Sequence, residues 1–563
     1  MKRLIVLCCM LVLLFAPCAG FCTDYYVDVN TGSDHNSGSS PDDAWKTITW
    51  ALAVGIGTQD DQCVIHIAPG KYAPPLEVFP LAPPSYTSLV GASPEEVVID
   101  AEGSACVLGI GGDRVVLSGL TVTGGSASQG GGICVARRGC RIDNCVVRGN
   151  QSDRGGGLSI DFPGGGFAEV NDCIICENRA GGDYHCQGGG IYMSSQYGEG
   201  LVRVTRCLIS SNVSSQGAGI AVVRTSLELV DSVLADNIAE SQNEYESVGG
   251  GLGVRPIYSL LMLDAKNCLF ISNRNLDGPG GAGFINLDVQ GTAAKFSGCT
   301  FAGNTARDAG PALDVEIHKD YSLDAVEVTD CIFRDGGDEI SEERAGLVVV
   351  NNSCVEGGWA GAGQNNFDAD PLFVSGPFCD YYLSQRAAGQ GQDSPCVDAG
   401  SMTAAEAGMA AKTTRTDGMA DTGVVDIGFH YPMLFMPPQV WVSTPSDTYS
   451  HGDTLEMVFE VINPNPFSYP VDLYAAIIAA DGVIWTIDAG WNWAVALNPW
   501  FASLELPAGL TFGPTTLLTI ALPSASPPIS APGTYWAAAA FAHVGTTTFI
   551  GQPSLSAFEL IGD

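Results

Sequence analysis

Arginine residues concentrate in one stretch of the chain, with a phenol and an imidazole close by. Ten of the 17 arginines after residue 22 lie between residues 114 and 224, among them Arg154 and Arg179, and Tyr184 and His185 follow. A base beside cationic neutralisers is what a polysaccharide lyase needs to remove a proton next to a uronate carboxylate. The bland alternative, which we favour, is that the arginines pair with surface carboxylates and His185 is solvated.

Oxygen-bearing side chains alternate near the start of the chain. Asp28, Asn30, Gly32 and Asp34 form the pattern D-x-N-x-G-x-D, which can turn several oxygens toward one hard cation, so calcium is the metal we expect if there is one. The terminal Glu of a twelve-residue calcium loop is missing, because Ser39 stands there. Asx turns that cap a helix starting near Trp45 are the favoured alternative.

Aromatic residues gather in the last third of the chain. Trp485, Trp491, Trp493 and Trp500 lie within a short stretch that ends at Phe501. Aromatic rings in loops stack on sugar faces or anchor protein contacts, so these tryptophans are candidate ligand-binding residues. Packing in a core explains them equally well.

Cysteines divide into a periodic set and a set in loops. Fifteen cysteines follow residue 22, and Cys379 with Cys396 is the pair we expect to form a disulfide, with Cys176 and Cys186 as a second option. The periodic set falls in an inward-facing column, where Cys behaves as a small buried hydrophobe. Its members are Cys145, Cys173, Cys207, Cys268, Cys299 and Cys331.

The periodic cysteines belong to a repeat that predicts the fold. An Asn follows five residues after each of six repeat positions, giving Asn150, Asn178, Asn212, Asn237, Asn273 and Asn304, whereas the seventh copy has Gly336. Apolar columns stand three residues before and two residues after the Cys position, so the chain must bend just before it. Gly-rich triplets recur as corners. Each repeat is therefore one coil of a parallel β-solenoid, with an expected Asn ladder at one corner.

Three groups of motifs resemble known extracellular proteins. The opening YYVDVNTGSDHNSGSSPDDAWKTITWALA with IHIAPGKYAPP resembles the cap and first coils of bacterial right-handed parallel β-helix proteins of the pectin-lyase-like class. GGGI and CTFAGN look like repeats of polymorphic outer-membrane proteins, and NNFDADPLFV, SPCVDAGS and DTGVVDIGFHYP are similar to the end of choice-of-anchor Q proteins. The resemblance covers roughly residues 24 to 432, and it implies a fold more than an activity. The RxPxxR motif of pectate lyases and the GHG and RIK motifs of polygalacturonases are absent.

The composition divides the chain into three parts. Residues 1–22, with Lys2 and Arg3 before an apolar run, predict a signal peptide and hence a secreted or cell-surface protein. Residues 23–432 predict the all-β, right-handed parallel β-helix with a short helical cap. Residues 433–563 read as an antiparallel, Ig-like β-sandwich of short strands between Gly and Pro turns.

The charge balance limits the partners. Lys and Arg total 25 against 62 Asp and Glu, for a net charge of -37, so we expect neither nucleic acid nor anionic lipid as a partner. No later segment is apolar enough to span a membrane, and we expect a monomer. The sequence therefore predicts a non-catalytic surface or matrix protein that binds a polysaccharide or a cell-surface protein. A carbohydrate-active lyase using the Arg-rich coils is the alternative.

Overall fold

The computed structural model describes most of the chain from Phe21 to Ile561. The residues outside it are 1–20, 56, 182–185, 197–199, 242–246, 256–260, 290–291, 318–324, 377–378, 433–438, 451, 464–468, 480–482, 489–492, 496–497, 507–509, 523–528, 530–531, 543–548 and 562–563. The expected signal peptide therefore lies almost wholly outside the described residues and stays a prediction. The chain divides into two compact units, which interleave along the sequence between residues 373 and 430.

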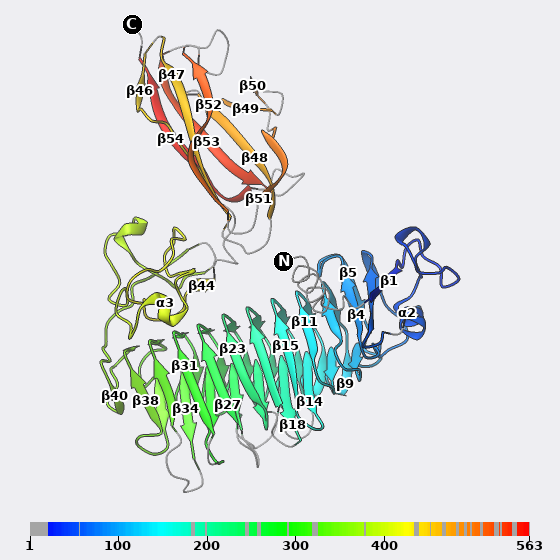
Figure 1. The fold of residues 1–563 in the computed structure, drawn as a ribbon. Coiled ribbons are helices and arrows are strands. Elements are labelled where there is room, and N and C mark those ends of the chain that lie inside the picture. Colours follow the sequence, from blue (N-terminus) through cyan, green and yellow to red (C-terminus); the bar gives the residue numbers. More distant parts are fainter. Residues whose placement is uncertain are drawn as a thin grey trace, which may run out of the picture. The chain divides into compact units, whose positions relative to one another are not determined.

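The first unit is a parallel β-helix, as expected, whose coils stack from blue to green in Figure 1. Each coil contributes one short strand to each of up to four parallel sheets, numbered here in the order in which a coil meets them.

Sheet 1 consists of β1 (Phe21–Val27), β2 (Asp61–Ile67), β4 (Thr87–Gly91), β7 (Val116–Ser118), β11 (Cys140–Asp143), β15 (Gly166–Asn171), β19 (Gly200–Thr205), β23 (Ser226–Val230), β27 (Met262–Lys266), β31 (Ala293–Ser297), β35 (Val326–Thr329), β38 (Val348–Asn351) and β40 (Ala362–Gln364). Sheet 2 consists of β3 (Gly70–Tyr72), β5 (Val97–Asp100), β8 (Thr121–Thr123), β12 (Val146–Arg148), β16 (Ile174–Cys176), β20 (Leu208–Ser210), β24 (Val233–Ala235), β28 (Leu269–Ile271), β32 (Thr300–Ala302), β36 (Ile332–Arg334) and β39 (Cys354–Val355).

Sheet 3 consists of β9 (Ser126–Gln129), β13 (Gln151–Arg154), β17 (Arg179–Ala180), β21 (Val213–Ser214), β25 (Ile238–Ala239), β29 (Arg274–Asn275) and β33 (Thr305–Ala306). Sheet 4 consists of β6 (Leu108–Ile110), β10 (Ile133–Val135), β14 (Leu158–Phe162), β18 (Ile191–Ser195), β22 (Ile220–Val223), β26 (Leu252–Val254), β30 (Gly283–Asn286), β34 (Leu313–Glu316) and β37 (Ile340–Glu342).

The expected bend before each Cys position is confirmed. The residue there has a left-handed backbone in every coil from Asn144 to Asp330, with φ between 47° and 61°. This bend separates sheet 1 from sheet 2, and it lets residues on both sides of the corner point inward. Gly155 turns the corner between sheets 3 and 4 with φ 66°, and a Cβ on Gly157 would lie 2.7 Å from the carbonyl oxygen of Gly190 in the next coil. Close coil stacking therefore requires glycine at that corner.

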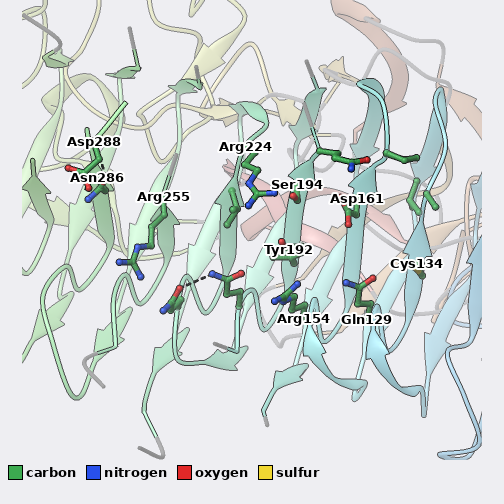
Figure 2. Close-up of a pocket in the computed structure, with 17 residues that line it drawn as sticks. Gln129, Cys134, Arg154, Asp161, Tyr192, Ser194, Arg224, Arg255, Asn286 and Asp288 are labelled. Atoms are coloured by element: carbon green, nitrogen blue, oxygen red, sulfur yellow. Dashed lines mark hydrogen bonds between the residues drawn. The ribbon is translucent and has the colours of Figure 1, made fainter. Parts of the chain in front are cut away.

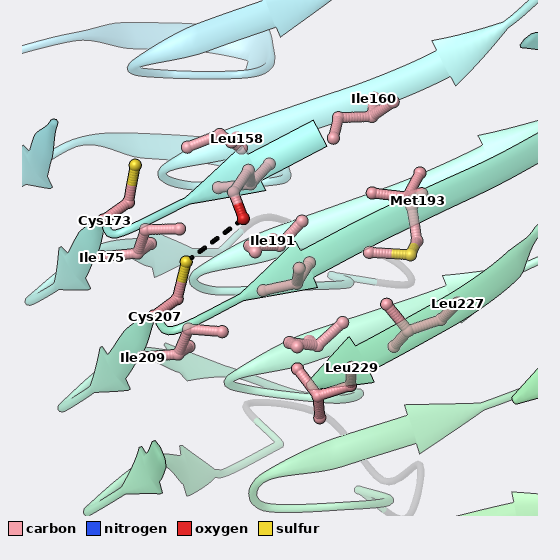
Figure 3. Packing of buried hydrophobic residues seen from close by; sticks show 14 of the residues in the cluster. Leu158, Ile160, Cys173, Ile175, Ile191, Met193, Cys207, Ile209, Leu227 and Leu229 are labelled. Atoms are coloured by element: carbon pink, nitrogen blue, oxygen red, sulfur yellow. Dashed lines mark hydrogen bonds between the residues drawn. The ribbon is translucent and has the colours of Figure 1, made fainter. Parts of the chain in front are cut away.

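The core consists of side chains stacked in columns from coil to coil (Figure 3). Ile175 pairs with Ile209 across β16 and β20, and both are fully buried. The periodic cysteines form a neighbouring buried column, in which the Cys207 thiol donates to the carbonyl oxygen of Val170 at 3.4 Å. Their role as buried hydrophobes is thus confirmed.

The asparagine ladder is confirmed and has one direction. The Nδ2 of Asn178 donates to the Oδ1 of Asn212 at 3.1 Å, and the same geometry recurs at each rung from Asn150 to Asn304. The ladder ends one residue before Gly336, because the Nδ2 of Asn304 donates to the carboxylate of Asp335 at 3.0 Å.

A short cap covers the first coils. It contains η1 (Pro41–Asp43) and α2 (Ile48–Val54), which buries Ile48 and Ala51 against the core, so the helix expected from Trp45 begins three residues later. The Thr47 hydroxyl caps α2 by accepting from the backbone N–H of Trp50 at 3.1 Å.

Residues Gln392–Ala407 and Thr422–His430 belong to the first unit and are called the closing segment here. The segment contains α3 (Ala404–Ala407) and covers the outer face of sheet 2 over the last coils. The backbone N–H of Phe429 donates to the Thr300 hydroxyl at 2.9 Å, and Ser401 donates to the Asp330 carboxylate at 2.7 Å.

The second unit ends in an antiparallel β-sandwich, as expected. One sheet holds β45 (Gln439–Ser443), β47 (Thr454–Ile462) and β52 (Thr511–Ala521). The other holds β46 (Thr448–Tyr449), β54 (Phe549–Leu560), β53 (Gly533–Ala542), β48 (Tyr469–Ile478), β49 (Ile484–Ile487) and β50 (Trp493–Ala494), with β51 (Phe501–Leu506) paired to β48. Phe459, Ile477 and Phe541 lie in the core between them. An Ig-like topology and a domain boundary at residue 432 stay predictions.

The second unit also takes in residues 373–391 and 408–421. They carry β41 (Phe373–Val374), β42 (Tyr382–Leu383), η2 (Arg386–Ala388) and β43 (Lys412–Thr413), which pairs with β44 (Tyr431–Pro432). Tyr382 and Tyr431 stack with ring centroids 3.7 Å apart. Among the described residues, no helix is long and apolar enough to cross a membrane.

Candidate functional site

Coil register brings outward side chains together where sheet 3 passes into sheet 4. The residue before each Gly corner lies beside its counterpart in the next coil, as Arg154 does with Gln187 and Gln187 with Gln216. Outward residues of sheet 4 form parallel rows, since Tyr192 pairs with Ser159 and Ser194 pairs with Asp161. Positions that are 25 to 36 residues apart in the repeat therefore meet on one surface.

These rows line a groove of about 730 Å³ across the strands from β10 to β30 (Figure 2). Its lining includes Gln129, Cys134, Arg154, Asp161, Gln187, Tyr192, Ser194, Gln216, Val223, Arg224, Arg255, Asn286 and Asp288. Tyr192, Ala221 and Val223 form a small buried apolar patch in it. The groove thus offers an apolar base with polar groups around it, the usual make-up of a ligand site.

Three arginines give the groove positive charge. Arg154, Arg224 and Arg255 make no ion pair within the described part of the chain. Several other arginines of the β-helix are paired with carboxylates, as Arg203 is with Glu228 at 2.6 Å and Arg206 with Asp172 at 2.6 Å. In a chain with more than twice as many acids as bases, unpaired guanidinium groups in a groove leave positive charge available to a ligand.

The arginines are placed by local structure. The Arg154 guanidinium lies over the Tyr192 ring, 5.9 Å from its centroid, which holds it at the edge of the groove. Arg224 has a left-handed backbone with φ 70°, and its Nε is buried with no hydrogen-bond partner among the described residues. A donor left unsatisfied in a groove favours binding of an acceptor.

Candidate acid–base groups in the groove are few. Asp161, Asp288 and Tyr192 line it, and no histidine does so among the described residues. Burial, more than the nearby charge of Asp161, raises the pKa of Cys134, so this thiol is a poor nucleophile at neutral pH. The described arrangement suits binding of an anion better than general base catalysis.

The structure brings one of the expected catalytic residues into the groove. Arg154 lines it, but Arg179 points to Glu240 and forms an ion pair of 2.7 Å, which supports the alternative weighed for it in the sequence. Tyr184 and His185 lie outside the described residues. The sequence pattern did not identify Arg224 and Arg255 as groove residues. Arg255 could have been found, because it lies seven residues after Val248, the residue before a Gly corner, and Asp161 lies at the same distance after Arg154.

The expected calcium ligands are engaged with protein donors. The Asp28 carboxylate accepts from the backbone N–H of Asn30 and from the Thr31 hydroxyl, at 2.7 and 2.6 Å. Asp34 accepts from the backbone N–H groups of Lys46 and Thr47 at 2.9 and 3.0 Å. Asn30 donates to the Pro69 carbonyl. This geometry supports the Asx-turn alternative, and the calcium site stays a prediction.

The tryptophans of the sandwich differ in exposure. Trp500 is 2% exposed and packs beside Phe459, with ring centroids 5.5 Å apart, so its ring is not available to stack on a sugar. This placement corrects its assignment as a ligand-binding residue and supports the core-packing alternative. Trp485 and Trp493 are half-buried, and Trp491 lies outside the described residues.

The two cysteines of the expected disulfide have other neighbours. The Cys379 thiol lies 2.6 Å from the Tyr431 hydroxyl, and the Cys396 thiol lies beside that of Cys354. Both are free thiols in the structure. The pairing of Cys379 with Cys396 stays a prediction, as does the second option, Cys176 with Cys186.

Comparison with known proteins adds fold-level likeness only. No family model and no curated protein matches the chain. Pectin methylesterase from Erwinia chrysanthemi is 12% identical with a TM-score of 0.26, over 65% of this chain and 95% of its own. A mannuronic acid-specific family 6 polysaccharide lyase from human gut microbiota is 13% identical with a TM-score of 0.29, over 57% and 79%. Similarities this weak carry no inference about activity.

Proposed function

We propose that the β-helix binds an acidic polysaccharide along the groove between sheets 3 and 4 and does not cleave it. The observation that carries this proposal is the set of groove arginines without carboxylate partners among the described residues. A guanidinium matches a carboxylate or sulfate with two parallel hydrogen bonds, and an arginine already paired with Glu or Asp cannot offer them.

The shape of the groove supports a chain-like ligand. Neighbouring parallel strands are about 4.8 Å apart, so the strands from β10 to β30 present polar groups over roughly 24 Å. Amide side chains such as Gln187 and Gln216, which are hydrogen-bonded to each other at 2.8 Å, suit sugar hydroxyls.

The test is a binding measurement on the full chain. We expect calorimetry to detect binding of polygalacturonate or alginate oligosaccharides and not of a neutral glucan of equal length. Arg154→Ala, Arg224→Ala and Arg255→Ala should each weaken binding about 10- to 100-fold, because a charge-assisted hydrogen bond contributes about 1.5 to 3 kcal/mol.

Arg203→Ala is the matched control. Arg203 lies on sheet 1 with Glu169 and Glu228 as partners, and it also stacks on an aromatic ring, that of Phe167, at 5.5 Å. Its removal should leave binding unchanged. Equal losses in Arg203→Ala and in the groove variants, or equal binding of the neutral glucan, would refute the proposal.

A polysaccharide lyase is the second candidate, and the neighbouring Arg154 and Tyr192 are what favours it. An arginine beside a phenol could stabilise the phenolate that a lyase base would require. Ultraviolet absorbance of unsaturated uronates, followed with calcium and with chelator, separates the candidates. We expect no turnover; turnover lost in Tyr192→Phe or His185→Ala, and kept in Arg203→Ala, would establish catalysis.

We further propose that the chain is exported and acts outside the cell as a monomer. The segment Lys2–Phe21, with its basic start and apolar run, supports a cleaved signal. Mass spectrometry of the mature protein should find a new N-terminus within a few residues of position 22. An intact N-terminus on protein recovered from the cytoplasm would contradict export.

A further inference from the structure

The outer face of sheet 2 changes from exposed to covered along the β-helix. Ile174 and Leu208 are 41% and 37% exposed, whereas Thr300, Ile332 and Cys354 in later coils are buried. These three occupy the same outward row, since Thr300 pairs with Ile332 and Ile332 pairs with Cys354. The closing segment covers this row of residues. One of its contacts is a hydrogen bond of 2.9 Å from the backbone N–H of Gly428 to the carbonyl oxygen of Asp330.

Cys354 and Cys396 meet under this cover. Ser353, and not Cys354, continues the inward cysteine column, because its hydroxyl accepts from the backbone N–H of Cys331. Cys354 therefore points outward, to the closing segment, where its thiol donates to the Ala369 carbonyl oxygen at 3.2 Å and lies beside the thiol of Cys396. Both are at most 1% exposed.

The surrounding backbone holds the two thiols together. The Cys354 N–H donates to the Cys331 carbonyl oxygen at 2.9 Å, and the Cys396 carbonyl oxygen accepts from Ile427 N–H at 2.8 Å. One cysteine is fixed to the last coil of sheet 2 and the other to the closing segment. A covalent bond between them would join two parts of the first unit that otherwise share only non-covalent contacts.

We propose that Cys354 and Cys396 form a disulfide that fastens the closing segment to the last coil when the protein folds in an oxidising compartment. The oxidant is a protein or small-molecule disulfide. The Cys354 thiolate attacks one sulfur of that disulfide, forms a mixed disulfide and releases one thiol. Cys396, after losing its proton to water, attacks the Cys354 sulfur and expels the second thiol. Two protein thiols are oxidised and one external disulfide is reduced.

Burial of the pair fixes when the first step can take place. Because both thiols are buried in the folded unit, the first step takes place before the closing segment docks. The periodic cysteines lie inside the coil, where thiols such as those of Cys207, Cys268 and Cys331 contact main-chain carbonyl oxygens.

Peptide mapping of the full chain tests the proposal. The protein is refolded with oxidised and reduced glutathione, its remaining thiols are blocked, and it is cut with trypsin and a protease that cleaves before Asp. Cleavage at Asp368 and Asp370 separates Cys354 from Cys379, which a tryptic digest alone would leave in one peptide. We expect a linked pair of peptides that contain Cys354 and Cys396. A Cys379–Cys396 link, or thiols that all stay free, would overturn the proposal.

Thermal unfolding gives a second readout. Reduction should lower the Tm of the oxidised protein by about 3 to 10 °C, and it should leave the Tm of Cys396→Ser unchanged. Cys379→Ser is the matched control and should respond to reductant like the unmodified chain. An equal response of Cys396→Ser and Cys379→Ser would contradict the proposed bond. If Cys396→Ser does not fold, the peptide map of the unmodified protein decides alone.

Discussion

At the scale of single residues, Asp335 marks where the regular coil ends. In the earlier coils, a residue with a left-handed backbone stands between the strand of sheet 2 and the ladder Asn, as Gly303 does before Asn304. Asp335 follows β36 directly, so the ladder position comes one residue sooner. The repeat pattern in the sequence placed Gly336 at the ladder position, because it lies five residues after Cys331 as in the other copies. A fixed offset does not show that this coil lacks one bend residue.

The Asp335 carboxylate also destabilises the fold at neutral pH. Burial and the charge of Glu339 raise its pKa well above the ordinary value, and its Oδ2 has no hydrogen-bond partner among the described residues. A carboxyl whose pKa is raised on folding stabilises the fold fully only below its unfolded pKa. That contribution is lost as the pH rises through the folded pKa.

We therefore predict that Asp335→Asn raises the thermal midpoint at pH 7 by a few degrees. The amide can still accept from Asn304, and it carries no charge to repel Glu339. Thermal unfolding followed at pH 7 and at pH 4 checks this, with a gain that shrinks at the lower pH because the wild-type carboxyl is then protonated. Asp338→Asn, at an exposed neighbouring position, is the control. A gain that does not change with pH would contradict the argument.

At the scale of elements, the aromatic column shows how strands hold coils together. Phe301 is fully buried, and its ring stacks on Phe270 and on Phe333, with centroids 4.7 Å apart on each side. Phe301→Ala should lower the free energy of unfolding by about 3 to 5 kcal/mol, because it removes the contacts of a buried ring and leaves a cavity in the column.

Denaturant unfolding of the Phe301→Ala variant measures this loss. Phe167→Ala, which removes the half-buried partner of Arg203, should cost much less. The coils contact mainly their neighbours, so the loss is expected as an earlier transition of the late coils that hold β28, β32 and β36. Equal effects of the two substitutions would contradict the central place of the aromatic column.

The elements differ in how far the sequence predicts them. The coils were predictable, since side-chain parity around each Cys admits only a chain that bends there, and Asn144 to Asp330 confirm it. The closing segment was not, because it has no period and its contacts join residues far apart, such as Asn267 and His430. The groove was recognised in part through Arg154. Of its other arginines, Arg255 keeps a repeat position that the sequence shows, whereas Arg224 required the strand register that only the fold supplies.

At the scale of the whole molecule, the excess of acidic residues affects the stability of the fold. With 62 acidic residues against 25 basic ones, self-repulsion opposes compactness, and monovalent salt screens it over a Debye length of about 8 Å. We predict that calcium chloride raises the thermal midpoint more than sodium chloride of equal ionic strength. A bound ion adds about 2.7 kcal/mol at a hundredfold excess over its Kd.

Calorimetry of the wild type and of Asp34→Ala decides this prediction. The substitution should lower the midpoint without calcium, since Asp34 accepts hydrogen bonds from Lys46 and Thr47. It should also abolish the extra effect of calcium if the proposed site holds the ion. A variant that responds to calcium like wild type would show that Asp28 and Asp34 serve only as turn residues.

The one-way asparagine ladder has an evolutionary consequence. Each rung donates to the next rung and accepts from the one before it, so a rung is completed by its neighbours whatever their number. Duplication of one whole coil in the gene would insert a rung without breaking any other. The same event would add one row of side chains to the groove, so the length of the proposed binding groove can change during evolution in steps of one coil.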